Sequence, residues 1–491
     1  MFKFKFKRAV AAALAAVTVI GFSGCGKKQT ASKYTDDETE PYEILWYYIG
    51  SSGNKDLPEV EKEVNKYLKE KINATVKMNV FDYGTYQTKI SNIASSGEKY
   101  DLRWINRASY QTEAYKGAFI DINELFSEYA PKTRKLLGED FLKGCMVDGK
   151  LYAVPANKDK AHYRSLFYRK DIADKYGLDL SGVKTWEEMY KYYDVIKEKE
   201  PGMYCYGIGG GTSPWDVLSG YEDVTGNNFI GFLPGSDKLQ VLYETDEFEK
   251  YCKMAHEMYL NGYVHKDVAV EDNTSRLKSQ GKIFCFAGQS KPGKLEELNA
   301  QGDFVYGEIK LSDTETTEID ALGSMMAIPV TCKNPVRVMK FIELLNTDKY
   351  LNNLINFGIE GKHYEKVSDN RITVIKDSGY NNIGNQWVYG NIFENYVYDG
   401  EDDDKFKILK EFNESSKVSD KMGFLPNMDP VKIQASSCLN VCNEFIKSLT
   451  YGVVDVDETL PKFKKKLDAA GVDEVLAELQ KQYDEWKKNN K

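Results

Sequence analysis

Histidine and cysteine are scarce in this chain of 491 residues. The four histidines, His162, His256, His265 and His363, show none of the short spacings that metal sites use. Apart from Cys25, the cysteines are an odd, scattered set of seven: Cys145, Cys205, Cys252, Cys285, Cys332, Cys438 and Cys442. This set makes a poor disulfide framework, and most members have apolar neighbours, which is typical of small buried side chains. We expect no metal and no cofactor.

Motifs of nucleophilic and nucleotide chemistry are also missing. There is no Gly-x-Ser-x-Gly, so the usual signature of a serine hydrolase is absent. The glycine cluster at 207–211 is not followed by Gly-Lys-Ser/Thr, and Pro214 breaks any immediate helix, which favours a turn or a close backbone approach over phosphate binding. Because Asp and Glu number 75, a carboxylate pair for sugar hydrolysis stays open but uninformative. No catalytic residue is predicted.

A long apolar run occurs only near the start of the chain. Lys3, Lys5, Lys7 and Arg8 precede an apolar stretch over 9–22, which is shorter than the roughly 20 residues that span a bilayer. A basic head, a short apolar stretch and small residues before a cut site are typical of a secretory signal peptide. We therefore predict a signal peptide over residues 1–24.

Cys25 follows Phe22-Ser23-Gly24, and this segment resembles the lipobox of bacterial lipoproteins, whose cysteine is diacylated. Phe22 occupies the position that is usually Leu. Two acyl chains on Cys25 would supply the double signal that stable anchoring needs. Residues 25–41 are polar and predict a flexible tether. The body is expected to be lipid-anchored at the extracytoplasmic face of the cell membrane, with ordinary secretion as the alternative.

The chain that follows the signal peptide is acidic and globular. It has 467 residues (491 less the first 24), enough for two or three domains with their own cores. Loss of the four basic charges takes the formal net charge from −9 to −13. Nucleic-acid binding needs a clustered basic face, so we expect no nucleic-acid partner.

Hydrophobic periodicity predicts an α/β fold. Strand patterns over 43–48, 74–81 and 100–105 alternate with helical stripes such as Val60, Val64 and Leu68. Strands that alternate with helices in this way form βαβ units and a mostly parallel sheet. From about Ser436 the pattern is helical to the end.

Aromatic residues gather just after the predicted strand ends, interleaved with Asp, Asn and Gln. In open α/β sheets, ligands bind beyond the carboxyl ends of the strands. Aromatic faces stack on the apolar C–H faces of a sugar, and the polar side chains serve its hydroxyls. The candidate ligand-binding residues are Tyr48, Asp82, Tyr83, Trp104, Asn106, Trp215, Asp216, Gln289, Asn385, Trp387 and Tyr389.

Several stretches resemble the extracellular solute-binding proteins of bacterial ABC importers, in particular the sugar-binding type called family 1. Val147-Asp148-Gly149-Lys150-Leu151-Tyr152-Ala153-Val154-Pro155 is similar to the family's first lobe crossing. Leu166–Asp171 with Lys184–Glu188 is similar to its strand, Asp-led helix and Thr-Trp-Glu-Glu run. Leu354–Tyr364 resembles a segment of a subgroup of large Gram-positive lipoproteins, which also have a long C-terminal region.

The resemblance implies a two-lobed periplasmic-binding-protein-like fold with a hinge, an interlobe ligand cleft and a helical C-terminal end. By analogy, lobe one is predicted at 42–155 plus 290–340, and lobe two at 156–289 plus 341–491. It further implies a non-enzymatic, monomeric receptor that captures a carbohydrate, most simply an oligosaccharide, by hinge closure and delivers it to the transmembrane permease subunits of an ABC transporter.

Three alternatives remain open at this stage. One is a binding protein for a peptide or another small solute, and a second is a surface glycoside hydrolase. A third is a lipoprotein that presents its ligand to a sensor kinase instead of a transporter. Each would use a similar aromatic and acidic composition, so the sequence does not choose among them.

Overall fold

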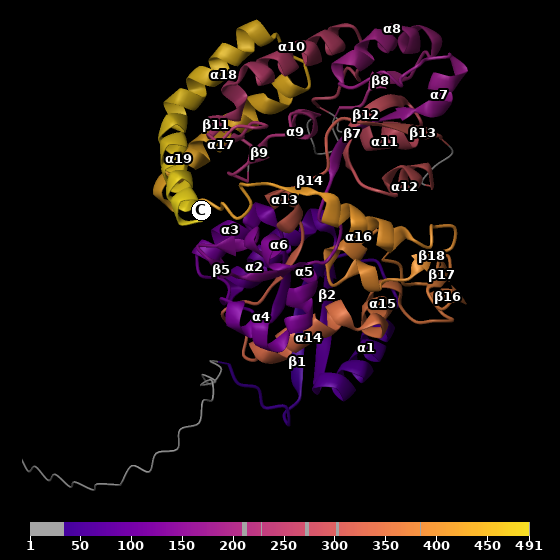
Figure 1. Cartoon of the computed structure of the whole chain (residues 1–491), viewed down its shortest axis with the longest axis vertical. Helices are drawn as coiled ribbons and strands as arrows, with labels where there is room; N and C mark the ends of the chain where they lie inside the picture. Colours follow the sequence, from indigo (N-terminus) through magenta and orange to yellow (C-terminus); the bar gives the residue numbers. More distant parts are fainter. Residues whose placement is uncertain are drawn as a thin grey trace, which may run out of the picture.

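The computed structural model describes residues 34–208, 214–226, 228–270, 274–300, 304–382 and 384–490. The predicted signal peptide, Cys25 and the glycines at 209–211 lie outside these residues. Two lobes lie one above the other along the long axis of the molecule, with lobe one at the bottom of Figure 1 and lobe two at the top. Within the described ranges, no helix is both long and apolar enough to cross a membrane.

Lobe one is built on a five-stranded sheet with the order β2-β1-β3-β15-β6. Strands β1, β2 and β3 are parallel, and Tyr42 of β1 pairs with Ala74 of β2, while β15 is antiparallel to both of its neighbours, β3 and β6. The predicted alternation of strand and helix is confirmed: β1 (Tyr42–Ile49), α1 (Leu57–Ile72), β2 (Ala74–Phe81), α2 (Tyr83–Ser96), β3 (Leu102–Ile105), then β6 (Ala153–Pro155) and β15 (Met325–Ala327).

Helices from distant parts of the sequence cover this sheet. Asn334 caps α14 (Pro335–Thr347) by accepting from the backbone N–H of Arg337, and Pro335 fits the first turn because its missing N–H is not needed there. Asp348 caps α15 (Lys349–Phe357) in the same way. Their buried stripes pack with Trp46 and Tyr48 of β1, whose rings stack at 3.9 Å.

Lobe two has a four-stranded sheet with the order β13-β7-β12-β8. Strand β7 (Tyr163–Arg169) is antiparallel to both β12 (Ile283–Ser290) and β13 (Tyr306–Lys310), whereas β8 (Tyr204–Tyr206) is parallel to β12. Helices α8 (Tyr190–Lys199) and α10 (Asp246–Leu260) lie over it.

The C-terminal end is helical, as predicted. Helices α17 (Lys432–Thr450), α18 (Val456–Ala470) and α19 (Val472–Asn489) form the yellow flank of the upper lobe in Figure 1. Their buried residues, including Phe463 and Leu479, belong to the core of lobe two. This region is therefore a structural part of lobe two.

The predicted lobe boundaries at 290 and 341 are wrong, because packing and strand pairing assign those segments differently. Strand β13 pairs with β7 in lobe two, although 290–340 was assigned to lobe one. Helices α14 and α15, with Tyr380 and Tyr389, pack in the core of lobe one, although 341–491 was assigned to lobe two. The predicted tether over 25–41 also needs correction, because residues 34–41 are described and Asp36 is buried against Arg337.

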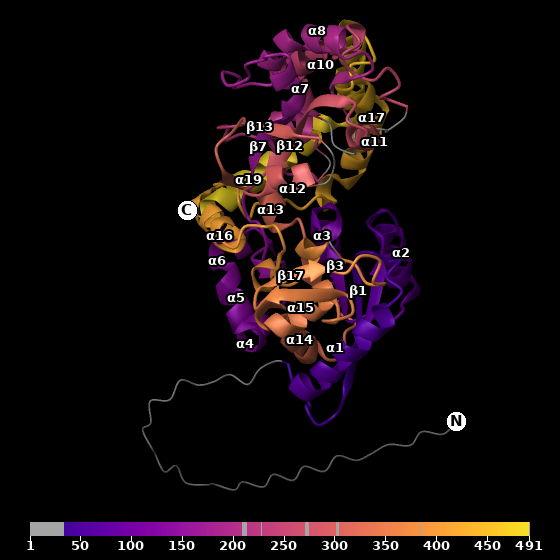
Figure 2. The same cartoon turned by 90° about the vertical axis from the view of Figure 1, so that its right-hand side faces the viewer.

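Three chain segments connect the lobes. Strand β14 (Glu315–Thr316) pairs in parallel with β19 (Lys417–Val418), and His162 bridges to Glu315. Beyond β19, Met422 and Leu425 enter the core of lobe one while Phe424 enters that of lobe two. Figure 2 shows this connecting layer near α13 (Glu318–Ala321) and α16 (Lys405–Ser415).

Candidate functional site

A cavity of about 820 Å³ lies beside the connecting layer and is lined by residues of both lobes. Trp387, in the 3₁₀ turn Gln386–Val388, lines it from lobe one, and Gln289, at the end of β12, lines it from lobe two. His162 and Asp320 come from the connecting segments. Its volume falls in the range of small-molecule sites. The cavity brings together two of the predicted ligand-binding residues.

The lobe-one wall of this cavity is aromatic. The rings of Phe357 and Tyr396 stack at 6.1 Å, and Tyr398 meets Phe357 edge-on at 5.6 Å. The side-chain amide of Gln386 donates to the hydroxyl of Tyr398 at 2.9 Å. Trp387 is half-buried beside them. This wall offers apolar ring faces next to amide and hydroxyl groups, which is the combination that a sugar ring can use.

The charged residues of the cavity neutralise one another. Lys291 lies 3.5 Å from Asp159, and Lys294 lies 3.3 Å from Glu297. Lys405 pairs with Glu401 at 2.5 Å. Burial alone would raise the pKa of Asp159, but Lys158 and Lys291 lower it overall. Each pair places a hydrogen-bond donor next to an acceptor, and because the two charges cancel, these pairs give the cavity no net charge.

His162 lies in the floor of the cavity and in the hinge. Its Nδ1 is 2.9 Å from Asp320 Oδ1, and its Nε2 is 3.6 Å from Glu315. Burial alone would lower the pKa of His162, but the hydrogen bond with Asp320 raises it overall. The ring thus ties two of the connecting segments together.

A second group of predicted residues forms the rim of lobe one at the carboxyl ends of β1 and β2. The Ser52 hydroxyl donates to Asp82 at 2.5 Å, and this bond lowers the pKa of the Asp82 carboxyl. Asn385 donates to the Ser51 hydroxyl at 3.3 Å, which links the rim to the turn that holds Trp387. Tyr83 is 64% exposed and lies edge-on to Trp104. Asp82, Tyr83, Asn385 and Trp387 therefore belong to one continuous rim.

The other predicted residues occupy structural positions. Tyr48, Trp104 and Tyr389 are at most 4% exposed in the core of lobe one, and Trp215 is buried in that of lobe two. Trp104 also donates its indole N–H to the Ser324 hydroxyl at 2.7 Å. Asn106 caps helix α3 (Arg107–Tyr115) by accepting from Ala108, and Asp216 accepts from the Tyr221 hydroxyl. None of these four buried rings lines the cavity between the lobes, although Trp215 lines a separate pocket within lobe two.

Sequence reasoning missed much of the aromatic wall. Phe357, Tyr396 and Tyr398 come from a region without a predicted strand, although Tyr396 and Tyr398 have the period of two that a strand would give. Of the cavity's charged residues, Lys158, Lys291 and Lys294 carry no pattern that separates them from other surface lysines. In the residues that the structure describes, no cluster of His, Cys, Asp and Glu could hold a metal ion.

Comparisons with known proteins identify the family of this chain. A family model described as bacterial extracellular solute-binding protein matches residues 62–359, and a domain of unknown function matches residues 421–488. A carbohydrate ABC transporter substrate-binding protein of Streptococcus pneumoniae is 31% identical over 100% of this chain and 99% of that protein.

Solved structures extend the comparison. The crystal structure of an N-glycan transport solute binding protein from Streptococcus pneumoniae is 29% identical, with a TM-score of 0.83, and covers 92% of this chain and 100% of that one. The same protein in complex with Man5GlcNAc gives a TM-score of 0.75 at 30% identity, with the same coverage. An alginate-binding protein, at 17% identity and a TM-score of 0.62 over 91% of this chain and 98% of that one, shares the fold.

Proposed function

Because the chain belongs to the bacterial extracellular solute-binding protein family, we propose that it captures an oligosaccharide between its lobes and delivers it to an ABC transporter permease. The observation that carries this proposal is the cavity shared by Trp387 and Gln289, since a ligand there touches both lobes at once. The carbohydrate transport relative, similar over its full length, favours a sugar over a peptide.

The lining favours an uncharged sugar. Stacking surfaces come from Trp387 and the ring cluster of Phe357, Tyr396 and Tyr398, and hydrogen bonds come from Gln289 and Gln386. Lys291, Lys294 and Lys405 pair with carboxylates, so an acidic ligand would have to compete with Asp159, Glu297 and Glu401 for these lysines. A neutral oligosaccharide can accept from the lysines and donate to the carboxylates without separating them.

Hinge closure is the proposed capture step. The Streptococcus pneumoniae structure matches this chain at a TM-score of 0.83, whereas its Man5GlcNAc complex matches at 0.75. Since the two belong to one protein, the two structures differ in conformation. A ligand drives such a change only through contacts that it gains in the closed form. Here, those contacts would come from Gln289 and Lys294 of lobe two.

The remaining parts of the proposal concern location. Cys25 would be diacylated and would anchor a monomeric body at the extracytoplasmic face of the membrane, where the permease would meet it. Relatives of this chain are substrate-binding proteins of transporters, which supports a receptor without enzymatic activity. Replacement of Cys25 by Ala should release the protein from the membrane fraction without altering ligand affinity.

Calorimetric titration of the chain from residue 27 onward tests the proposal. We would use Man5GlcNAc, neutral linear oligosaccharides, an acidic oligosaccharide, peptides and polyamines as probes. Binding of a neutral oligosaccharide that is recovered intact after incubation is the expected result, and saturation should raise the unfolding midpoint by mass action. Shortened sugar products would overturn the receptor assignment, and binding of peptides alone would overturn the sugar.

A further inference from the structure

The segment between the predicted lipid anchor and β1 is bound to the body of lobe one. Asp36 is only 4% exposed in its side chain, and the guanidinium of Arg337, in α14, is completely buried. Arg337 Nε donates to Asp36 Oδ2 at 3.0 Å and Nη2 donates to Oδ1 at 2.8 Å. This two-pronged contact is the strong geometry for an arginine and a carboxylate.

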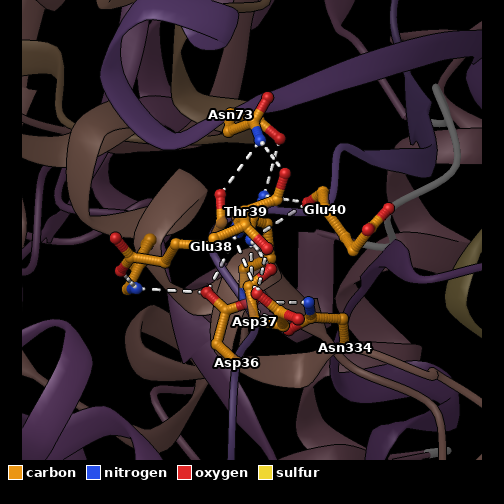
Figure 3. A network of polar contacts seen from close by, with 9 residues as sticks. Asp36, Asp37, Glu38, Thr39, Glu40, Asn73 and Asn334 are labelled. Atoms are coloured by element: carbon orange, nitrogen blue, oxygen red, sulfur yellow. Dashed lines mark hydrogen bonds and ion pairs between the residues drawn. The ribbon is translucent and has the colours of Figure 1, made fainter.

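Further bonds fix the backbone on both sides of Asp36. Arg337 also donates to the carbonyl oxygens of Asp37, at 3.0 Å, and of Asn73, at 2.6 Å. The side-chain amide of Asn73 donates to the Glu38 carbonyl at 2.9 Å. Figure 3 shows Asn73, at the end of α1, and Asn334, just before α14, lying against the segment from Asp36 to Glu40.

Two further side chains, besides Arg337, bind the Asp36 carboxylate. Asn334 donates to its Oδ1 at 2.7 Å, and Lys340 Nζ lies 3.1 Å from its Oδ2. Burial alone would raise the pKa of Asp36, but Arg337, Asn334 and Lys340 lower it to about 2. Before this point, the hydroxyl of Tyr34 donates to the Asp121 carbonyl at 3.2 Å. Residues 34–40, called the strap below, therefore lie on lobe one as a bound segment.

The strap lies at the edge of the sheet opposite the candidate site. It leads directly into Tyr42, the first residue of β1, whereas Ser51, Ser52 and Asp82 follow the carboxyl ends of β1 and β2. Because β1 has 8 residues, the two edges are about 26 Å apart. In Figure 1 the strap leaves the lower end of lobe one, away from lobe two.

We propose that the strap fixes the face that the protein turns to the membrane: the base of lobe one is membrane-proximal and lobe two is distal. Only the chain from Cys25 to Tyr34 then separates the anchor from the body, with a maximum span of about 32 Å. Without the strap contacts, the chain from Cys25 to Tyr42 could span about 61 Å. The strap thus halves the reach of the anchor and directs the cleft away from its own attachment point. The membrane part of this inference rests on the lipid anchor of the proposed function.

Proteolysis of the full processed chain tests the strap itself. A protease that cuts after Glu should cleave slowly after Glu38 in the wild-type protein, whereas the bond after Glu40 resists it because Pro41 follows. Asp36→Ala should accelerate the cut after Glu38 at least tenfold, and Arg337→Lys should give an intermediate rate because an ammonium cannot form the two-pronged contact. Asp37→Ala is the matched control, since the Asp37 carboxylate bonds to Thr39 within the strap. Equal rapid cleavage of the wild type and Asp36→Ala would overturn the strap.

Fluorescence quenching on vesicles tests the orientation. Dyes would be placed on Glu70→Cys, in the last turn of α1, whose C-cap Asn73 binds the strap, or on Lys199→Cys, at the end of α8 in lobe two, in a Cys332→Ser background. The other cysteines of the described chain are buried. Headgroup quenchers should affect the dye at position 70 several-fold more than the dye at 199, and Asp36→Ala should reduce this difference. Equal quenching of the two dyes in the wild-type protein would overturn the orientation. Failure of the chain to float with vesicles would overturn the lipid anchor, and the proteolysis experiment would then test the strap alone.

Discussion

The guanidinium of Arg107, in lobe one, donates a hydrogen bond of 2.7 Å to the carboxylate of Asp223 in lobe two. The Asp223 side chain is 2% exposed and that of Arg107 is 18% exposed. Arg107 begins helix α3, and its backbone N–H donates to the Leu322 carbonyl next to the hinge. The ion pair thus joins the lobes where they are connected, in a place shielded from water.

Loss of one partner of this pair should be costly. Arg107→Gln leaves the Asp223 carboxylate buried without its counter-charge, so the free energy of unfolding should fall by about 3 kcal/mol. Thermal or urea unfolding of the purified protein would measure the change. The double variant Arg107→Gln with Asp223→Asn should recover much of the loss, since it removes the stranded charge. A double variant no more stable than the single one would argue against the pairing.

Glu318 lies next to this pair and predicts a dependence of stability on pH. Its side chain is buried, and Oε1 has no hydrogen-bond partner among the described residues. Burial raises the pKa of Glu318 to about 8, although Arg107 opposes the shift. The folded state holds this proton more tightly than the unfolded chain does. The stabilisation that comes from protonated Glu318 is therefore fully present below about pH 4.5 and is lost as the pH rises through 8.

Glu318→Gln should remove that loss. Unfolding midpoints measured from pH 5 to 9 should fall less steeply for Glu318→Gln than for the wild-type protein. Glu257→Gln, a change at an exposed position of α10, is the control and should follow the wild-type curve. Parallel curves for Glu318→Gln and the wild type would contradict a proton held at Glu318.

Substitutions of tryptophan should separate ligand contact from packing. Trp387→Ala removes a half-buried ring that lines the cavity and packs against the edge of the lobe-one core, so ligand affinity should fall several-fold with a smaller loss of stability than a core substitution causes. Trp104→Ala and Trp215→Ala empty core positions and should cost about 3–5 kcal/mol of stability. Calorimetric titration and thermal unfolding of the three variants would give both quantities. Unchanged affinity in Trp387→Ala would remove this ring from the binding site.

The secondary structure of lobe one could be predicted because its signals are local. The stripe of Val60, Val64 and Leu68 has the helical period and is buried in α1 as expected. The assignment of helices to lobes could not be predicted. The apolar stripe of α14 specifies a buried helix face, but only the tertiary structure shows that this face packs on the sheet of lobe one.

The sequence allowed the position of the candidate site to be predicted, but only some of the side chains that line it. The carboxyl ends of β1 and β2 do form a rim, yet Tyr48 points into the core and Tyr83 into solvent. Burial does alternate along β1, where Trp46 and Tyr48 are buried and Tyr47 is only partly buried, but the sequence pattern does not show which of the two faces is the buried one. Gln289 and Trp387 meet at one cavity only because the chain returns to lobe one after building most of lobe two.

A close contact at Gly452 joins the end of α17 to α10 and can be tested by substitution. Its φ of +74° is in the left-handed region, and a Cβ at this position would lie 2.1 Å from the carbonyl oxygen of Ala255 in α10. His256 Nδ1 also lies 2.7 Å from the Gly452 carbonyl oxygen, so a side chain of α10 is hydrogen-bonded to the backbone at Gly452. Gly452→Ala must therefore push α17 away from α10.

The expected result is a loss of stability well above that of backbone strain alone. Gly235→Ala is the matched control, because Gly235 has a φ of +76° but no atom within 4 Å of an added Cβ. We expect about 1 kcal/mol for Gly235→Ala and an additional loss of about 1–3 kcal/mol for Gly452→Ala, measured by unfolding. Proteolysis should also cut residues 432–489 faster in Gly452→Ala, because helices separated from lobe two lose their buried face. Equal losses in the two variants would show that the contact between α10 and the end of α17 contributes nothing, and that the C-terminal helices hold to lobe two by their apolar side chains alone.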